Sequence, residues 1–147
     1  MSDLKTSNHV KILLDIEGDD GTTDVESVWA VPENGNYRID NIPFYARGFA
    51  LGDLVAATPD PDGLLRCTGV VMPSGHSTVR LWFANSTRVQ EVRAELQALG
   101  CSDELDLDRL LAVDIPPQIP FAQVKAFLDE KESDQILEYE EGCLGQG

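Results

Sequence analysis

The sequence changes its periodicity within HSTVRLWFANSTRVQEVRAELQALG, residues 76–100. The first eight residues, His76–Phe83, alternate between polar and apolar types in a way that is typical of a strand. Apolar residues then recur at helical spacing as far as Gly100, a residue type that favours the left-handed end of a helix. Thr87 and Gln90 have the spacing of a capping box, which predicts that the helix begins there. A strand followed by an amphipathic helix indicates a fold that mixes both element types.

Short alternating segments precede this stretch and are separated by turn residues. We expect strands at 11–16, 25–31, 36–42, 54–58 and 64–71. The pair Asn34-Gly35 favours the positive φ angles of a hairpin turn. Two prolines and Gly63 mark a further turn at 59–63. These signals predict an N-terminal antiparallel meander that can curl into a barrel.

The C-terminal part continues with a second helix between two more strands. Residues 110–115 indicate a strand, Pro120 begins a helix, and residues 136–140 alternate as a last strand. The order β-α-β-α-β from His76 onward indicates a split βαβ layer. The predicted class is therefore α+β. The expected domain organisation is a disordered N-terminus at 1–8, one domain at 9–141 (mainly β at 9–83, the β-α-β-α-β part at 84–141) and a flexible tail at 142–147.

The formal net charge of −15 limits the kinds of partner that the protein can bind. Residues 101–147 hold twelve acidic and three basic residues, so this third of the chain carries −9 of the total. Such a molecule repels nucleic acid and anionic membranes, and it attracts basic proteins over about one Debye length, ~8 Å in physiological salt. We therefore expect a basic protein partner, without direct binding to nucleic acid or membranes.

The remaining composition predicts a cytoplasmic protein without a cofactor. No apolar run approaches the roughly 18 residues of a membrane span, and the N-terminus lacks a signal-peptide core. The three cysteines are widely spaced and form no C-x-x-C pair, which argues against a disulfide framework and a structural zinc site. The oligomeric state is left open.

Two acidic clusters form the first candidate binding site. They could present carboxylates to lysines and arginines of another protein; the alternative is a solvated turn and a strand edge charged against pairing. The candidate partner-binding residues are Asp103, Glu104, Asp106, Asp108, Glu138, Glu140 and Glu141.

The second candidate site is a small-molecule pocket around the segment Ser74–Arg80. Strand alternation places His76 and Arg80 on one face, where a base and an anion-binding group could meet. The loop that follows the third strand could add Tyr45 and Arg47, because loops frequently carry functional residues. The alternative is a hairpin with a local serine–backbone hydrogen bond and a structurally satisfied histidine. The candidate pocket residues are Tyr45, Arg47, Ser74, His76 and Arg80.

Other polar and aromatic residues are best explained as structural. The acids between Asp15 and Glu26 partly match a calcium loop, but its glycine is displaced and its flanks resemble strands, so a solvated hairpin turn is favoured. Asp53 is expected to cap a turn. Trp29 and Trp82 alternate within strands and are expected in the core.

Four motifs, considered together, resemble a family of small bacterial proteins described as domain of unknown function 4265. The resemblance extends from about Val25 to Tyr139 and implies a stand-alone bacterial protein. It also directs attention to the Pro43–Arg47 loop and the Ser74–Arg80 segment, while implying no activity. The motifs that carry it are Asn41-Ile-Pro43-Phe44, Gly52-Asp53-Leu-Val55, Ser74-Gly75-His76-Ser77-Thr78-Val79-Arg80 and Leu99-Gly100-Cys101.

The hypothesis favoured by the sequence is a non-enzymatic protein-binding module, such as an immunity or antitoxin protein that neutralises a basic toxin nuclease. Charge steering would speed the encounter, and buried aromatic or arginine anchors would supply the affinity. The alternative is an enzyme or small-molecule-binding protein that uses the His76, Arg80 and Arg47 pocket. A mimic of double-stranded DNA is less favoured, because the acids cluster at turns instead of forming rows.

Overall fold

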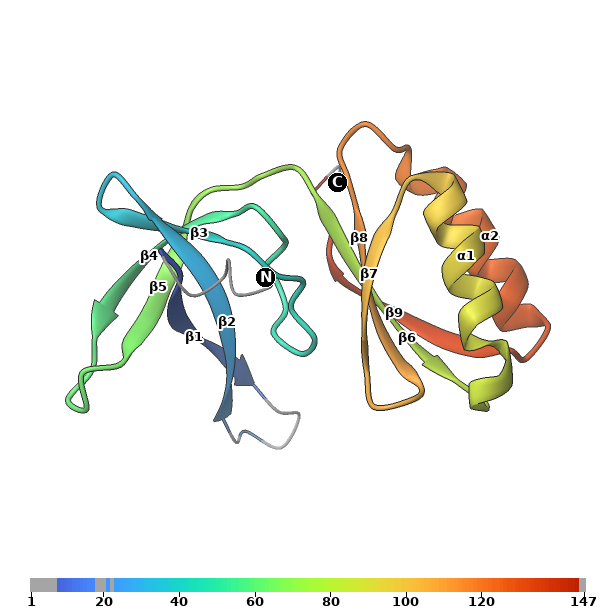
Figure 1. Cartoon of the computed structure of the whole chain (residues 1–147), viewed down its shortest axis with the longest axis horizontal. Helices are drawn as coiled ribbons and strands as arrows, with labels where there is room; N and C mark the ends of the chain where they lie inside the picture. Colours follow the sequence, from blue (N-terminus) through green and yellow to red (C-terminus); the bar gives the residue numbers. More distant parts are fainter. Residues whose placement is uncertain (1–7, 18–20, 22, 146–147) are drawn as a thin grey trace.

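Two hydrophobic cores divide the chain into a closed β-barrel and a four-stranded sheet that carries two helices (Figure 1). The computed structural model describes residues 8–17, 21 and 23–145. Residues 1–7 of the N-terminus expected to be disordered at 1–8, and residues 18–20 and 22 of the expected turn between Asp15 and Glu26, therefore lie outside the described residues. The α+β class is confirmed, and the meander curls into a barrel.

Five strands form the barrel, and consecutive strands pair antiparallel. Closure is completed by a short parallel pairing of the first and last strands, Ile12 with Leu65 and Leu13 with Arg66. Small and branched apolar side chains fill the interior. The strands are β1 (Val10–Glu17), β2 (Thr23–Glu33), β3 (Asn36–Ile39), β4 (Leu54–Pro59) and β5 (Leu65–Met72).

The turn between β2 and β3 forms as the sequence predicts. Asn34 and Gly35 have φ angles of 51° and 86°, and the residues on either side of them, Glu33 and Asn36, are paired across the hairpin. Positive φ at both central residues suits the right-handed twist of the flanking strands. Strand β3 is shorter than expected, because it ends at Ile39 and a long loop, residues 40–53, follows it.

The second part has the order β-α-β-β-α-β, which is the split βαβ arrangement with one strand more than the sequence indicates. The strands lie in the order β7-β8-β6-β9 and all neighbours are antiparallel. Both helices cover one face of this sheet (Figure 1). The elements are β6 (Ser77–Phe83), a 3-10 turn (Ser86–Arg88), α1 (Val89–Leu99), β7 (Ser102–Asp106), β8 (Leu110–Ile115), α2 (Phe121–Ser133) and β9 (Leu137–Cys143).

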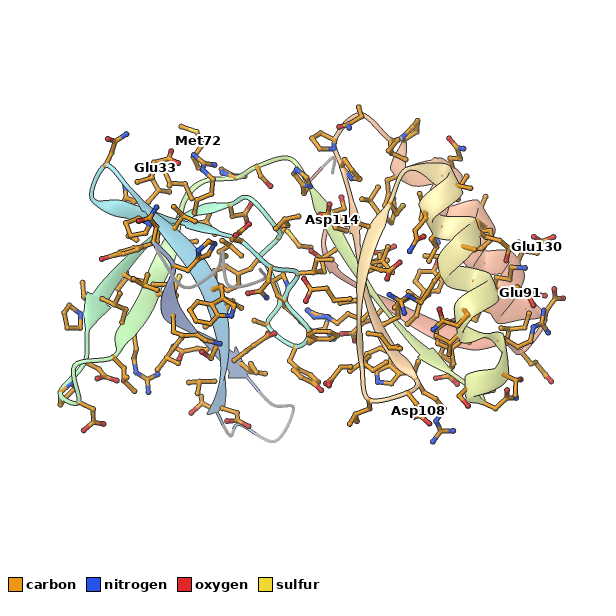
Figure 2. All side chains as sticks on the ribbon, viewed as in Figure 1. Glu33, Met72, Glu91, Asp108, Asp114 and Glu130 are labelled. Carbon is orange, nitrogen blue, oxygen red and sulfur yellow. The ribbon has the colours of Figure 1, made fainter. Side chains whose placement is uncertain are left out.

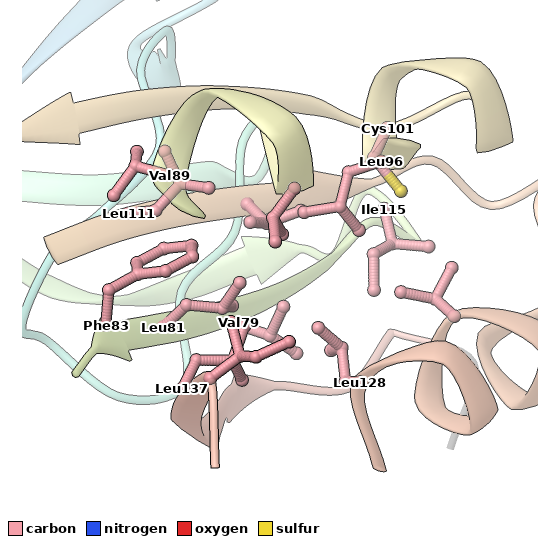
Figure 3. Close-up of a cluster of buried hydrophobic side chains, with 14 residues drawn as sticks. Val79, Leu81, Phe83, Val89, Leu96, Cys101, Leu111, Ile115, Leu128 and Leu137 are labelled. Atoms are coloured by element: carbon pink, nitrogen blue, oxygen red, sulfur yellow. The ribbon is translucent and has the colours of Figure 1, made fainter. Parts of the chain in front are cut away.

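Apolar side chains between this sheet and its helices form the larger core (Figure 3). Val79, Leu81 and Phe83 point from β6 toward the helices, as alternation along a strand requires. Leu96 of α1 and Leu128 of α2 pack against them from the helix layer. The helices thus use the face that the sequence pattern predicts.

Three local predictions need correction. The acidic segment after Gly100 is a strand, β7, and not a turn, because it pairs with β8 in an antiparallel hairpin. Helix capping occurs earlier than Thr87: the side chain of Asn85 accepts a hydrogen bond from the Thr87 backbone N–H, and a 3-10 turn precedes α1. At the C-terminal end, β9 continues through Cys143 instead of ending near residue 140.

Candidate functional site

The sheet face opposite the helices lies against the barrel, and the loop 40–53 covers part of it (Figure 1). Residues that alternate with the core residues point to this face. On β6 these are Thr78, Arg80 and Trp82, and the strand register places Asp114 of β8 beside Thr78. Candidate residues from both parts of the chain therefore meet here.

Glu26 of β2 holds the loop in place. Its carboxylate accepts three hydrogen bonds from consecutive backbone N–H groups, those of Phe44 at 2.6 Å and of Tyr45 and Ala46 at 2.9 Å. Each bond provides an acceptor for a backbone N–H group of the loop, which lies outside the paired strands. The residue considered above as a calcium ligand is thus a loop anchor.

Arg80 joins the sheet to this loop from a fully buried position. Its Nη2 donates to the backbone oxygen of Ala46 at 2.5 Å, and its Nε lies 3.8 Å from a carboxylate oxygen of Glu140. Burial lowers the pKa of Arg80, while the negative charges of Glu140 and Glu26 act in the opposite direction. A Cβ at Gly142 would lie 2.6 Å from Nη2, so the guanidinium packs directly against the backbone of β9.

His76 is oriented by a carboxylate that lies 38 residues away in the sequence. Both carboxylate oxygens of Asp114 lie 2.9 Å from His76 Nδ1, and Asp114 is buried. Burial raises the pKa of the Asp114 carboxyl group, and the interaction with His76 partly opposes this. The arrangement fixes the orientation of the imidazole ring. A fixed ring suits a catalytic base, and it equally suits a histidine whose only role is structural.

Ser74 does not form a nucleophile–base pair with this histidine. Its Oγ donates to the backbone oxygen of Leu51 at 2.8 Å and accepts from the backbone N–H of His76 at 3.2 Å. Asp53 accepts from the backbone N–H groups of Ala50 and Ser74, so its predicted role as a turn cap is confirmed. These contacts brace the connection between β5 and β6.

The five candidate pocket residues fall into two groups along β6. Tyr45, Arg47 and Arg80 gather near the carboxylates of Asp106 and Glu140: the Tyr45 hydroxyl donates to Asp106 at 3.2 Å, and Arg47 donates to Glu140 at 2.9 Å. His76 and Ser74 belong to the separate group described above. Every one of the five side chains forms a hydrogen bond to another part of the protein; the remaining partners are those of Ser74, His76 and Arg80 given above.

The seven candidate acidic residues also separate, because strand alternation sends them to different faces. Glu104, Asp106, Glu138 and Glu140 lie on the barrel side of the sheet, whereas Asp103 and Glu141 are on the helix side. Asp108 follows β7 in the exposed turn, at the opposite end of the sheet from Asp114 (Figure 2).

Several of these carboxylates already have partners within the protein. Asp103 pairs with Arg93 at 2.9 Å, and Glu104 accepts from the backbone N–H of Ile42. Within the described part of the chain, the carboxylates of Glu138 and Glu141 form no hydrogen bond or ion pair with another group. The acidic charge available to a partner is therefore smaller than the sequence count, and part of it lies near Trp82.

Neither tryptophan is in a core, contrary to the sequence expectation: Trp29 is partly buried and alternates with the buried residues Val28 and Ala30 of β2, and Trp82 is exposed on β6. Its side chain is on the barrel side of β6, where the loop 40–53 covers Thr78 and Arg80 but leaves Trp82 41% exposed. It borders two open hollows of about 540 and 420 Å³. Leu107, at the tip of the β7–β8 hairpin, lines the smaller one; it is 83% exposed and has a left-handed φ of 59°.

We call the exposed residues around these hollows the Trp82 surface. Tyr45 and Leu107 line the smaller hollow together with the ion pair of Asp108 and Arg109, and the carboxylates of Glu132 and Glu138 line the larger one. The surface consists of Tyr45, Trp82, Ala84, Leu107, Asp108, Arg109, Glu132, Gln135 and Glu138. The sequence analysis assigned Trp82 to the core, and it selected none of the surface residues Ala84, Leu107, Arg109, Glu132 and Gln135.

Two further findings concern metals and membranes. Within the described part of the chain, no group of three or more histidine, cysteine or acidic side chains is arranged to hold a metal ion. Neither of the two described helices is sufficiently long and apolar to cross a membrane.

Comparison with known proteins identifies a family but no activity. A crystal structure of a hypothetical protein from Neisseria gonorrhoeae superposes with a TM-score of 0.83 at 24% identity, covering 92% of this chain and 94% of that one, which shows a shared fold. No curated protein matches the chain. The model of the family described as Domain of unknown function (DUF4265) matches residues 26–139. This match spans most of the chain, and the protein therefore belongs to the DUF4265 family.

Proposed function

We propose that this protein is a binding module that captures a positively charged partner protein through the Trp82 surface. The observation that carries the proposal is the position of Trp82: it is exposed in a strand whose other side chains are buried, and it borders two hollows. Exposed tryptophan and tyrosine side chains are frequent anchors of protein interfaces, because they bury a large apolar area with little loss of side-chain entropy.

The shape and apolar content of the surface support a macromolecular partner. Tyr45 and Leu107 extend the apolar area around Trp82, and both hollows are open to solvent. A leucine exposed at a left-handed backbone position costs conformational energy without packing inside the protein. Packing of the Leu107 side chain against a partner protein would offset this cost.

The charge at the edge of the surface supports a basic partner. Glu132 and Glu138 border the larger hollow, whereas at the smaller one Asp108 lies 3.9 Å from Arg109, so the negative edge belongs to the larger hollow. Lysine or arginine side chains that flank an apolar anchor would complement this pattern, and the overall charge of −15 would attract such a partner during encounter. A toxin domain that this protein neutralises in a bacterial cytoplasm would satisfy these requirements, with no cofactor and no catalytic step.

The small-molecule alternative has less support. Arg47, His76 and Arg80 would have to exchange their bonds to Glu140, Asp114 and Ala46 for a ligand. None of these three side chains lines either hollow beside Trp82.

A peptide library displayed on phage would test the proposal, because it samples many candidate binding sequences at once. Peptides would be selected on the wild-type protein and then measured against Trp82→Ala and Glu138→Gln. We expect enriched peptides to combine lysine or arginine with an apolar residue, to bind Trp82→Ala at least about tenfold more weakly, and to lose affinity as salt rises.

Glu130→Gln is the matched control, because it removes the same charge from the exposed side of α2, away from both hollows (Figure 2). Enriched peptides that bind wild type and Trp82→Ala equally, or that contain no excess of basic residues, would refute the proposal. Equal losses in Glu138→Gln and Glu130→Gln would assign the effect to total charge instead of to this surface.

A further inference from the structure

Strand β5 exposes three consecutive apolar residues, Val70, Val71 and Met72, on the barrel. A barrel strand normally buries every second side chain, because successive residues point to opposite faces. Here the last five residues of β5 are all exposed. Figure 2 shows Met72 on the barrel, far from Asp108 and therefore from the Trp82 surface.

Two bulges explain this exposure. The pairing of β4 with β5 shifts register between Leu54 and Val55 and again between Ala56 and Ala57. Thr68 and Val71 are consequently the additional residues on β5 that have no opposite residue on β4. Each bulge bends the strand and interrupts the alternation, so that apolar side chains on both faces meet solvent.

The other side of the same segment has unpaired backbone groups. The parallel pairing of β5 with β1 includes only Leu65 and Arg66 on the β5 side. Within the described part of the chain, no strand pairs with residues 67–72 along that edge. Such an edge can accept a further strand, since its N–H and C=O groups are already aligned.

The segment also lacks the charges that usually protect an exposed edge. From Cys67 to Val79 the sequence contains no Asp, Glu, Lys or Arg, and this is the longest uncharged stretch in a chain of net charge −15. Two molecules that both carry −15 repel one another least where neither presents charge. This property favours a second copy of the chain over a basic partner, which would find no carboxylate on the strand itself.

We propose that two copies associate through residues 67–72 of β5, paired antiparallel across a two-fold axis. The same strand serves both partners in such an isologous contact. The pairing would complete the backbone hydrogen bonds along this edge and bury Val70, Val71 and Met72 of each copy. The contact is independent of the Trp82 surface and leaves that surface open on both subunits.

Sedimentation equilibrium over micromolar to millimolar concentrations tests the pairing. Val70→Lys places a charge in the proposed contact, and Val25→Lys is the matched control, because both valines are 38% exposed and both lie in barrel strands. We expect a concentration-dependent dimer for wild type and Val25→Lys, and a dissociation constant at least about tenfold higher for Val70→Lys. Circular dichroism would confirm that both variants fold.

The salt dependence separates this proposal from the proposed function. Added salt screens the repulsion between two acidic subunits, so the dimer is expected to tighten, whereas binding of basic peptides is expected to weaken. Hydrogen exchange at the backbone N–H groups of residues 67–72 should slow as protein concentration rises. A wild-type protein that stays monomeric at millimolar concentration, or a dimer that Val70→Lys leaves unchanged, would overturn the proposal.

Discussion

The guanidinium of Arg80 donates to the backbone oxygen of Ala46, and this bond connects β6, one of the two inner strands of the sheet, to the loop 40–53 of the barrel. The two residues are 34 positions apart in the sequence. Arg80 therefore supports the orientation of the two parts of the molecule, and through it the position of Tyr45 beside Trp82.

Replacement of this arginine should destabilise the fold strongly. In Arg80→Met the oxygen of Ala46 loses a buried donor and the carboxylate of Glu140 loses a nearby positive charge, and we expect the free energy of unfolding to fall by about 2–4 kcal/mol. Chemical denaturation followed by tryptophan fluorescence measures this change. Arg88→Met is the control, since its ion pair with Glu91 lies on the exposed surface and should matter little. Equal effects of both substitutions would contradict the role assigned to Arg80.

Removal of the Glu26 side chain should loosen the loop that follows β3. Glu26→Ala leaves three consecutive backbone N–H groups, those of residues 44–46, without their carboxylate acceptor. We expect a loss of about 2–3 kcal/mol in unfolding free energy and faster hydrogen exchange at these three positions. Glu26→Gln keeps one acceptor oxygen and should show a smaller change. Unaltered exchange at residues 44–46 in Glu26→Ala would contradict the anchoring role.

The buried carboxyl group of Asp114 should make the free energy of unfolding depend on pH. Because burial raises the pKa of this carboxyl group, the folded protein binds its proton more tightly than the unfolded chain does. The contribution of Asp114 to stability is thus fully present below the unfolded pKa, near 4, and is lost as pH rises through the folded pKa. The stability of Asp114→Asn relative to wild type should therefore increase as pH rises.

This comparison is best made between pH 3.5 and 5.5, below the usual titration range of histidine. Denaturant unfolding of both proteins across this range gives the difference directly, and its slope should not exceed about 1.4 kcal/mol per pH unit for a single proton. A difference that decreases with pH would mean that the attraction of His76 outweighs burial.

Leu107 offers a substitution that should stabilise the protein and weaken partner binding at the same time. Asparagine tolerates the left-handed φ of 59° better than leucine does, so Leu107→Asn should raise the unfolding free energy by about 0.5–1 kcal/mol. The same change removes an apolar side chain from the Trp82 surface and should reduce the affinity of the selected peptides.

Leu64→Asn is the control, because Leu64 is also exposed but has no positive φ. Thermal unfolding and peptide binding would be measured on both variants. A stability gain in both variants would argue against backbone strain at Leu107, and unchanged peptide affinity in Leu107→Asn would remove this residue from the binding surface.

Features that depend on a few neighbouring residues could be predicted from the sequence. The hairpin at Asn34-Gly35 and the helix end at Gly100 both follow from residues that tolerate positive φ. Strand β8 and the start of α2 follow from apolar pattern and proline position. Strand β7 was missed, because its acidic residues have low strand propensity and only pairing with β8 stabilises the extended form.

The candidate site could be predicted only in part. Alternation predicts His76 and Arg80 on one strand face, but β6 begins only at Ser77, and the partners Asp114, Ala46 and Glu140 come from distant segments. The residues adjacent in sequence to these partners contain no pattern that predicts the contacts. The exposure of Trp82 was missed for a related reason: a strand tryptophan is buried only where another segment covers it, and the loop 40–53 leaves this one partly uncovered.

The order of amino acids by itself determined most element types, the hairpin turn at Asn34-Gly35, the acidic character and the kinship with the DUF4265 family, since each depends on composition or on short-range pattern. Only the tertiary structure decided which carboxylates are bound internally, which tryptophan is exposed and which edge of the barrel is unpaired. The physical reason is that burial and pairing arise between segments tens of residues apart, where side-chain packing and hydrogen bonding act through space and leave no local trace in the sequence.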